Sequence, residues 1–328
     1  MDKHNLRRRN WSRWMIVLAI LALLLTACQG TPEPSTYIIG VASEFPAEEI
    51  LDEFKSTMTG LGYVEGENIT YIYHGILGGG QQANEAEIKI LMAEQVNVLL
   101  TLGSAPTKVA QKAVEGTNIP VVFSPATNPL GEKFVTSLRN PGGNLTGIQS
   151  IDSTPKALEW LLKLAPDTKL VYAPYHSGDQ SAPMSVKLLT DTAAQLGVEL
   201  VLDEVSSGDE VLVAVKDLPQ NSAILFPISP SIDPSLDDIL ELAIELEIPT
   251  GSTTNLTQDK LLFTYAVDLP RIGEQAGVMV DKILKGTDPG DLPVETAEFI
   301  LIVNLRTAQS IGIDVSDEIL YQAQRIVR

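Results

Sequence analysis

The sequence predicts an α/β protein made of two doubly wound lobes, each built around a parallel sheet. Short apolar runs typical of buried strands alternate with amphipathic helical stretches almost throughout the chain. This alternation favours parallel sheets that carry helices on both faces. The turn sequence RNPGGNLTG (139–147) interrupts the pattern, which then restarts. With 328 residues, of which 44% are hydrophobic, the chain is long enough for two lobes with sizeable cores.

The first half of the chain shows four strand-like runs separated by helical stretches. After the first run, Ile50, Phe54, Met58 and Leu61 recur near helical spacing, and the glycine-rich segment GLGYVEGENI then predicts a turn. The predicted strands are 37–42, 69–73, 97–102 and 119–124, and the later predicted helices are 84–95 and 106–116.

The second half repeats this plan. A helical stretch runs from Met184 to Leu196, and Asp233 followed by Pro234 predicts the N-cap and first residue of a helix over 233–247. Gly286 predicts the end of another helix, 271–286. The predicted strands are 169–174, 198–205, 222–228, 261–268 and 298–303.

The N-terminus has the pattern of an export signal. A basic segment, 3–13, precedes an unbroken apolar run, 14–25, and about 12 apolar residues are too few to span a bilayer as a helix. The following LTAC resembles the lipobox of bacterial lipoproteins, which implies a signal peptide over 1–27 and lipidation of Cys28. Residues 28–36 would then be a polar tether. The alternative is an uncleaved signal anchor in which Cys28, the only cysteine of the chain, is incidental.

The net charge of the chain and the motifs that it lacks argue against several classes of function. The formal net charge of −19 repels nucleic acids and anionic lipid headgroups, so neither is expected as a partner. The chain has three histidines, no G-x-S-x-G elbow and no cluster with metal-ligand spacing. It also lacks the glycine patterns of phosphate-binding and dinucleotide-binding loops. We therefore expect a protein that is not an enzyme and that uses no metal or cofactor.

Polar residues collect at the carboxyl ends of the predicted strands, where open α/β sheets bind ligands. Hydroxyls and helix N-termini at such an edge can hold a carboxylate, and Asp268 could hold an ammonium group. The alternative is that each polar side chain caps the helix that follows it. The candidate ligand-binding residues are Ser43, Glu44, Ser104, Thr107, Ser124, Thr127, Asn128, His176, Ser177, Ser229 and Asp268.

Three aromatic residues, Phe45, Tyr175 and Phe226, stand beside the same strand ends. They could stack on a flat ligand. The alternative is that they are core residues.

Several segments carry a resemblance to a known family along nearly the whole mature chain. They are GLGYVEGENIT, IPVVFSPATNPLG, NPGGNLTG and VDLPRIGEQAGVMVDKILKG. They resemble the ABC-transporter substrate-binding lipoproteins of the tryptophan/tyrosine-binding type. The resemblance implies a type I periplasmic-binding-protein fold, in which a hinge of three crossovers joins the lobes. Lobe one would comprise 37–147 and 270–297, and lobe two 148–269 and 298–328.

The resemblance also implies a function. The chain would be an exported, lipid-anchored solute-binding protein of an ABC importer, facing outside the cytoplasm of a bacterium. It would close around a small molecule, with an amino acid, and an aromatic one in particular, as the leading candidate. Its partners would be a membrane permease and, through it, a cytoplasmic ATPase. A ligand-sensing receptor subunit and an exported enzyme are the alternatives.

Among the candidate residues, Ser124, Ser177 and Asp268 match ligand-contacting positions of the family. The chain departs from the family at Ala105, at Asn128 and at 227–230, where relatives carry threonine, an acidic residue and the sequence PTDN. The loss of an acidic partner in the cleft would weaken the binding of an ammonium group.

Overall fold

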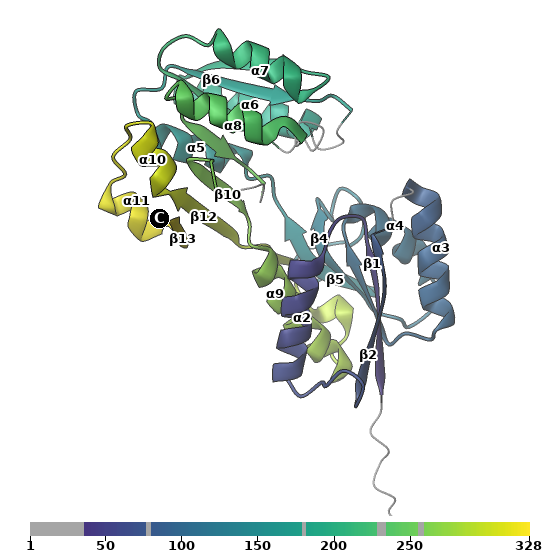
Figure 1. Ribbon diagram of the computed structural model, residues 1–328. Helices are drawn as coiled ribbons and strands as arrows, with labels where there is room; N and C mark the ends of the chain where they lie inside the picture. The colour runs from purple at the N-terminus through teal and green to yellow at the C-terminus, as the bar shows by residue number, and fades with distance from the viewer. Residues whose placement is uncertain (1–35, 77–79, 179–181, 228–233, 255–258) are drawn as a thin grey trace, which may run out of the picture.

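The computed structural model describes residues 36–76, 80–178, 182–227, 234–254 and 259–328. These residues form two lobes, each organised around one sheet (Figure 1). Most neighbouring strands are parallel, and helices cover both faces of each sheet. The predicted fold class is confirmed.

Lobe one is built on a sheet with the strand order β11-β5-β4-β3-β1-β2, in which every pair is parallel. Its strands are β1 (Tyr37–Ser43), β2 (Ile69–Ile76), β3 (Val98–Leu102), β4 (Val121–Thr127), β5 (Leu145–Ser150) and β11 (Glu295–Thr296). Helices α2 (Glu48–Gly60) and α9 (Leu269–Leu284) pack on one face, and α3 (Gly80–Ala93) and α4 (Ser104–Ala113) on the other. A short 3-10 helix, η2 (Pro289–Asp291), precedes β11.

Lobe two has the strand order β13-β12-β10-β9-β8-β6-β7. Its strands are β6 (Leu170–Tyr175), β7 (Glu199–Glu204), β8 (Ser222–Phe226), β9 (Thr250–Ser252), β10 (Phe263–Val267), β12 (Phe299–Asn304) and β13 (Arg325–Val327). One face carries α5 (Thr154–Leu164), α6 (Ala182–Leu196), α10 (Leu305–Ser310) and α11 (Asp317–Gln322). The other face carries α7 (Gly208–Lys216) and α8 (Leu236–Glu245). No helix in the described ranges is long and apolar enough to span a bilayer.

Within the described residues the chain passes between the two sheets three times. It leaves lobe one after β5, returns after β10 into α9, and leaves again between β11 and β12. The crossings lie side by side, because the amide of Asp268 donates to the carbonyl of Glu298 at 2.9 Å and the amide of Ala297 donates to that of Gln149 at 2.8 Å. Three adjacent extended segments therefore join the lobes.

The structure differs in detail from the sequence predictions at several places. Strand β12 runs antiparallel to β10, because the chain re-enters lobe two from the side of lobe one. Strand β5 continues to Ser150 in the first sheet, three residues past the boundary placed after Gly147, and Ile148 is fully buried there. Helix α8 begins at Leu236 and not at Pro234, and the predicted cap Asp233 lies outside the described residues.

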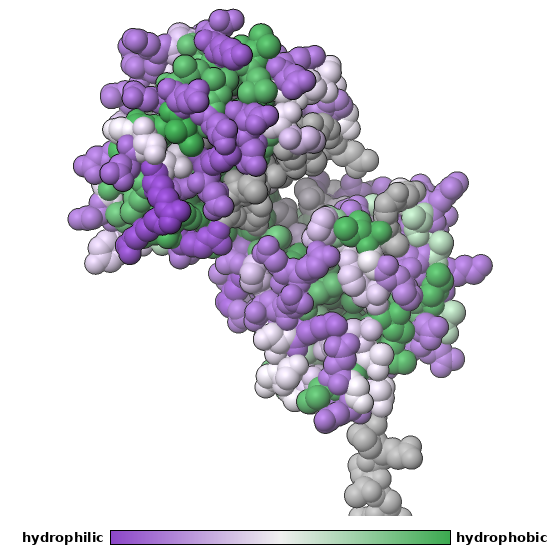
Figure 2. Space-filling model, viewed as in Figure 1, coloured by the Kyte–Doolittle hydropathy of each residue, from purple (hydrophilic) through white to green (hydrophobic). Residues whose placement is uncertain are grey.

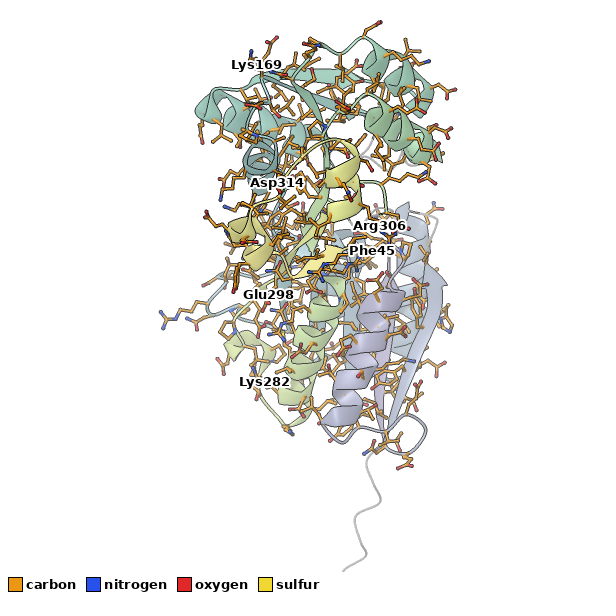
Figure 3. All side chains as sticks on the ribbon, turned by 60° about the vertical axis from the view of Figure 1, so that its left-hand side comes forward. Phe45, Lys169, Lys282, Glu298, Arg306 and Asp314 are labelled. Carbon is orange, nitrogen blue, oxygen red and sulfur yellow. The ribbon has the colours of Figure 1, made fainter. Side chains whose placement is uncertain are left out.

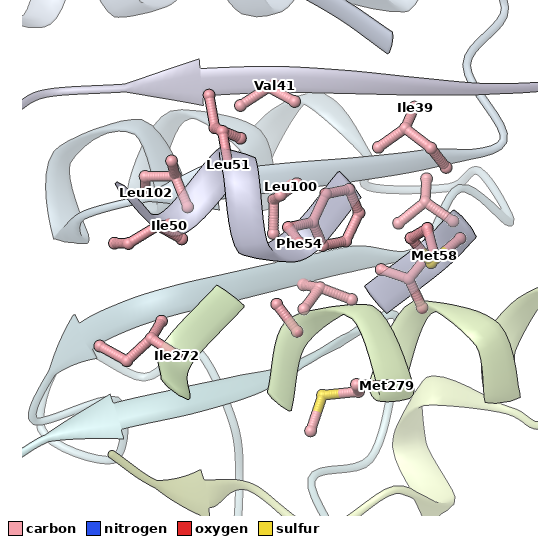
Figure 4. Packing of buried hydrophobic residues seen from close by; sticks show 14 of the residues in the cluster. Ile39, Val41, Ile50, Leu51, Phe54, Met58, Leu100, Leu102, Ile272 and Met279 are labelled. Atoms are coloured by element: carbon pink, nitrogen blue, oxygen red, sulfur yellow. The ribbon is translucent and has the colours of Figure 1, made fainter. Parts of the chain in front are cut away.

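The core of lobe one lies between its sheet and the helix pair α2–α9 (Figure 4). Phe54 and Met58 of α2, Leu100 of β3 and Ile272 of α9 are fully buried in this cluster. The predicted helical spacing of Ile50, Phe54 and Met58 therefore marks the face that packs on the sheet. Helix α9 lies beside α2 although more than 200 residues separate them in sequence (Figure 1).

Tyr63 connects the loop after α2 to helix α9, because its hydroxyl donates to Oδ1 of Asp281 at 3.1 Å. Burial first, and then this hydrogen bond, raise the pKa of Tyr63 to about 12 from 10.0. At pH values between 10.0 and about 12, the hydroxyl of Tyr63 loses its proton in the unfolded chain but keeps it in the folded protein. The contribution of Tyr63 to stability is thus present below pH 10 and is lost as the pH rises through this window.

We therefore expect Tyr63→Phe to lessen the fall in melting temperature between about pH 9 and pH 11.5, relative to the unmodified protein. Circular dichroism melts across this range measure the effect. Tyr321→Phe, at a side chain that is 92% exposed, is the control and should leave the profile unchanged. Parallel profiles for Tyr63→Phe and the unmodified protein would contradict the assignment.

Candidate ligand-binding site

The candidate residues of lobe one come together at the carboxyl edge of its sheet. Strands β1, β3 and β4 are neighbours, with Ser43 paired to Leu102 and Thr101 to Phe123. Ser124 follows at the same edge. Figure 3 shows Phe45, just beyond β1, at the end of lobe one nearest lobe two, and Figure 2 shows the surface hollowed between the lobes. The edge chosen from the sequence therefore faces the space between the two lobes.

Two of these hydroxyls hold the backbone of the edge loops. Ser43 is fully buried, and its Oγ donates to the carbonyl of Phe45 at 2.7 Å and accepts from the amide of Phe45 at 3.3 Å. Thr107 is also fully buried, and its Oγ1 donates to the carbonyl of Gly103 at 2.6 Å. As the structure stands, these side chains shape the β1–α2 and β3–α4 loops and present no surface to a solute.

Ser124 differs from these two hydroxyls. It is fully buried at the end of β4, and its Oγ has no hydrogen-bond partner among the described residues. A buried hydroxyl without a partner costs free energy. Of these three buried hydroxyls, that of Ser124 is therefore the one whose hydrogen-bonding capacity is unused among the described residues.

Glu44 lies over the N-terminus of α4. Its carboxylate lies against Gly103, the N-cap residue of that helix, next to the backbone amides of Ser104 and Ala105. Gly103 permits this approach, because a Cβ there would stand 2.0 Å from Oε1 of Glu44. Partial desolvation raises the pKa of Glu44, and the neighbouring backbone amides of Ser104 and Ala105 act in the opposite direction. The residue nevertheless remains exposed, so its carboxylate can meet a solute.

The remaining candidates of lobe one lie around the end of β4. Oγ of Ser104 accepts from the amide of Thr127 at 3.1 Å, which ties α4 to β4. Asn128 has a φ of 49° and its Oδ1 accepts from the amide of Gly131 at 3.1 Å, forming a local turn. Thr127 and Asn128 are exposed and Ser104 is half-buried.

In lobe two, His176 and Ser177 follow β6. Lys169, just before β6, lies at the end of lobe two away from lobe one in Figure 3, so β6 runs towards lobe one. Nδ1 of His176 accepts from the amide of Gly178 at 3.0 Å, and Ser177 is exposed. Ser229 lies outside the described residues.

The three aromatic residues singled out in the sequence have different environments. Phe226 is 3% exposed and belongs to the core beneath α7 and α8. Phe45 and Tyr175 are half-buried at the ends of β1 and β6. These two remain available for stacking on a solute, one from each lobe.

Asp268 stands at the second crossing and is the N-cap of α9. Its Oδ1 accepts from the amide of Arg271 at 3.2 Å, the capping role that was the alternative reading of this position. The guanidinium of Arg271 pairs with Glu298 at 3.2 Å and with Glu274. The carboxylate of Asp268 therefore already serves the structure of the crossing.

Sequence reasoning did not single out Asp152, which lies at the first crossing. Its Oδ1 accepts from the amide of Thr154 at 2.8 Å, and its Oδ2 accepts from the hydroxyl of Ser185 at 2.7 Å. Asp152 thus joins the start of α5 to α6. The signal was available, because Asp-Ser-Thr-Pro is a typical helix start.

A second depression, of about 840 Å³, lies in lobe two at the amino edge of its sheet, opposite to the carboxyl edge that carries His176 and Ser177. Its lining comes from the loops that precede β6, β8 and β9 and from Asp314 after α10. These loops lie at the amino ends of the strands, whereas ligands of such sheets bind at the carboxyl ends. Within the described ranges, no group of three or more His, Cys, Asp or Glu side chains could hold a metal ion.

Comparison with known proteins places this architecture in a family. A family model described as ABC transporter substrate binding protein matches residues 38–327. The tyrosine-binding protein of Clostridioides difficile (strain R20291) is 25% identical over 253 residues, which cover 76% of this chain and 72% of that protein.

Solved structures share the fold. One is an ABC domain in complex with L-Trp from Streptococcus pneumonia, with a TM-score of 0.72, 22% identity, and coverage of 89% of this chain and 100% of that one. Another is the ligand-free, open structure of a substrate binding protein with adhesive properties from Clostridium difficile, with a TM-score of 0.75, 21% identity, and coverage of 89% and 99%. Because the family model spans both lobes, the chain belongs to the ABC transporter substrate binding protein family, as the sequence resemblance indicated.

Proposed function

We propose that this protein is the lipid-anchored, extracytoplasmic binding component of an ABC importer, and that it binds an aromatic amino acid between its lobes. The observation that carries the proposal is the arrangement of the polar sheet edge of lobe one, which faces lobe two across three side-by-side crossings. This arrangement suits a solute that is held noncovalently by both lobes.

Binding would proceed by hinge closure. Each sheet has its own core on both faces, so each lobe can move as a rigid body. The crossings between them consist of short extended segments, which can absorb a rotation through a few backbone torsions. A solute that contacts both lobes only in the closed form shifts the population toward that form. The closed protein would then dock on a membrane permease.

The similarity to a tyrosine-binding protein and to an ABC domain in complex with L-Trp supports an aromatic amino acid as the solute. Phe45 and Tyr175 support it from the structure, because their half-buried rings lie at the facing strand ends of the two lobes. Stacking between such rings and a flat ligand contributes roughly 0.5–1.5 kcal/mol beyond burial. Ser124, with its unpartnered hydroxyl, would donate to the same ligand.

Calorimetry on a soluble form of the protein that begins after the lipidation site Cys28 tests the proposal with L-tyrosine and L-tryptophan. We expect one of them to bind and to raise the melting temperature, because a ligand present at about 100 times its Kd stabilises the folded state by about 2.7 kcal/mol. Mass spectrometry should recover the ligand chemically unchanged. If neither amino acid binds, the proposed ligand is wrong.

The anchor is tested separately in bacterial cells that express the full chain. Globomycin, which blocks lipoprotein signal cleavage, should cause the precursor to accumulate, and Cys28→Ser should prevent labelling by an alkyne fatty acid. Equal labelling of the unmodified protein and Cys28→Ser would exclude Cys28 as the lipidation site.

A further inference from the structure

Glu44, Asp152 and Asp268 are carboxylates near the place where the two lobes meet, and they differ in how many of their acceptor positions are already used. Asp268 caps α9, and Asp152 uses one oxygen on Thr154 and the other on Ser185. The carboxylate of Glu44 lies against Gly103 and beside the backbone amides at the start of α4, but the residue remains exposed at the edge of lobe one. Because an ionised carboxylate has about four acceptor positions, Glu44 keeps capacity for further donors.

Glu44 also changes the electrostatic potential at the N-terminus of α4. A free helix N-terminus attracts anions through its unpaired amides and its dipole. Here the carboxylate of Glu44 takes that position, over a glycine that leaves room for it. A ligand carboxylate is therefore excluded from this helix end, and what faces the space between the lobes is a negative charge held in place.

No cation of the described residues neutralises this charge. Lys108, on the same helix α4, pairs with Glu132 at 3.2 Å, and no ion pair links Glu44 to a Lys or Arg in the parts of the chain that the structure describes. The hydroxyl of Ser43 brackets the backbone of Phe45 on the other side, so the position of Glu44 is supported from both β1 and α4.

We propose that Glu44 is the lobe-one receptor for the protonated amine of the ligand, and that the protein thereby selects solutes that carry an ammonium group. This inference rests on the proposed function and specifies which end of the amino acid meets lobe one. It assigns to Glu44 the role that the family resemblance suggested for Asp268. The apolar part of the same solute would lie against Phe45, the next residue.

The test combines protein variants with ligand analogues in calorimetry. Glu44→Gln removes the charge but keeps a carbonyl oxygen for the amides of α4. Asp268→Asn removes a charge at the rival position and keeps a good N-cap. Glu65→Gln is the matched control, because Glu65 pairs with Lys55 in the loop before β2, at the opposite end of the sheet. The ligands are L-tyrosine, tyramine and 3-(4-hydroxyphenyl)propionate, which lacks the amine.

We expect Glu44→Gln to bind L-tyrosine at least about tenfold more weakly than the unmodified protein, since a charge-assisted hydrogen bond is lost. Glu65→Gln and Asp268→Asn should bind it within about twofold of the unmodified protein. The unmodified protein should prefer L-tyrosine to the propionate, and this preference should shrink in Glu44→Gln, which a double-mutant cycle quantifies.

The two proposals fail separately. If Glu44→Gln binds L-tyrosine as the unmodified protein does, or if the propionate binds the unmodified protein as tightly as L-tyrosine does, the role of Glu44 is overturned while the amino-acid ligand stands. If only tyramine binds, and Glu44→Gln loses it, the role of Glu44 stands and the amino-acid ligand is wrong. If Asp268→Asn alone loses affinity, the ammonium site belongs to Asp268. Absence of binding by L-tyrosine, L-tryptophan and tyramine overturns both proposals, whereas binding of L-tryptophan alone moves the same comparison to L-tryptophan, tryptamine and 3-(indol-3-yl)propionate.

Discussion

Gly273→Ala should lower the free energy of unfolding by about 3 kcal/mol, the upper part of the range for adding a methyl group to a closely packed interior. Gly273 lies on α9 where this helix packs against α2. A Cβ there would stand 2.2 Å from the carbonyl oxygen of Ile50 and 2.9 Å from the amide nitrogen of Phe54. Both are backbone atoms of α2, which cannot rotate away as a side chain would. The two helices would have to separate.

This contact has a functional consequence as well as a cost in stability. Helix α9 begins at Leu269, directly after the second crossing, so a displaced α9 would also displace the segment that joins the lobes. We expect Gly273→Ala to weaken ligand binding in addition to lowering stability, because the lobes would no longer meet in the same orientation.

Urea denaturation measures the loss, and Gly60→Ala is its matched control. Gly60 is the last residue of α2, and a Cβ there would meet nothing within 4 Å. Alanine at this position should be neutral or stabilise the protein by up to about 1 kcal/mol, because alanine favours the helix. Equal unfolding midpoints for Gly273→Ala and Gly60→Ala would show that α2 and α9 do not pack this closely.

Phe54→Ala should cost about 3–5 kcal/mol, the usual range when a buried phenylalanine is truncated to alanine. Phe54 is fully buried between the sheet of lobe one and α9. Its ring meets that of Tyr71 edge to face, with 5.8 Å between the centroids, and Figure 4 shows it among the aliphatic side chains of the cluster. Truncation would leave a cavity that the surrounding backbone cannot fill.

Phe54→Leu should recover most of this loss, because leucine refills much of the cavity. Tyr321→Ala is the exposed counterpart, since this side chain is 92% exposed, and it should change the free energy of unfolding by less than about 0.5 kcal/mol. Denaturant titrations of the three variants give the comparison. A Phe54→Ala protein as stable as Tyr321→Ala would contradict the burial of Phe54.

Apolar runs in the sequence are reliable signals of the buried strands of this protein. Strands such as 37–42 and 97–102 were predicted because apolar runs of that length belong to sheets buried on both faces, and they occur as β1 and β3. Strand β5 escaped prediction because it directly follows a Pro-Gly-Gly turn and contains Gly147. The glycine is required there, since a Cβ would stand 2.1 Å from the carbonyl oxygen of Phe123.

The sequence predicted which edge of the sheet carries the candidate site, but not which contacts each side chain makes there. Ser43 and Glu44 are adjacent polar residues, and from the sequence either could meet a solute. In the structure the hydroxyl of Ser43 is buried in its own turn, whereas Glu44 reaches across to a helix that begins 60 residues later. The residues next to Ser43 and Glu44 in the sequence do not indicate that this helix lies beside Glu44. The structural role of Ser43 and the exposed position of Glu44 could therefore not be told apart from the sequence.

The sequence by itself determined the fold class, the family and the edge at which polar residues gather. Each depends on patterns among neighbouring residues: periodic apolar positions, turn residues and short motifs. Only the tertiary structure decided that β12 runs antiparallel to β10, and that Asp268 is a helix cap while Glu44 faces the space between the lobes with no cation of the described residues paired to it. These features depend on which distant segments come to lie side by side, and local patterning does not encode distances between them.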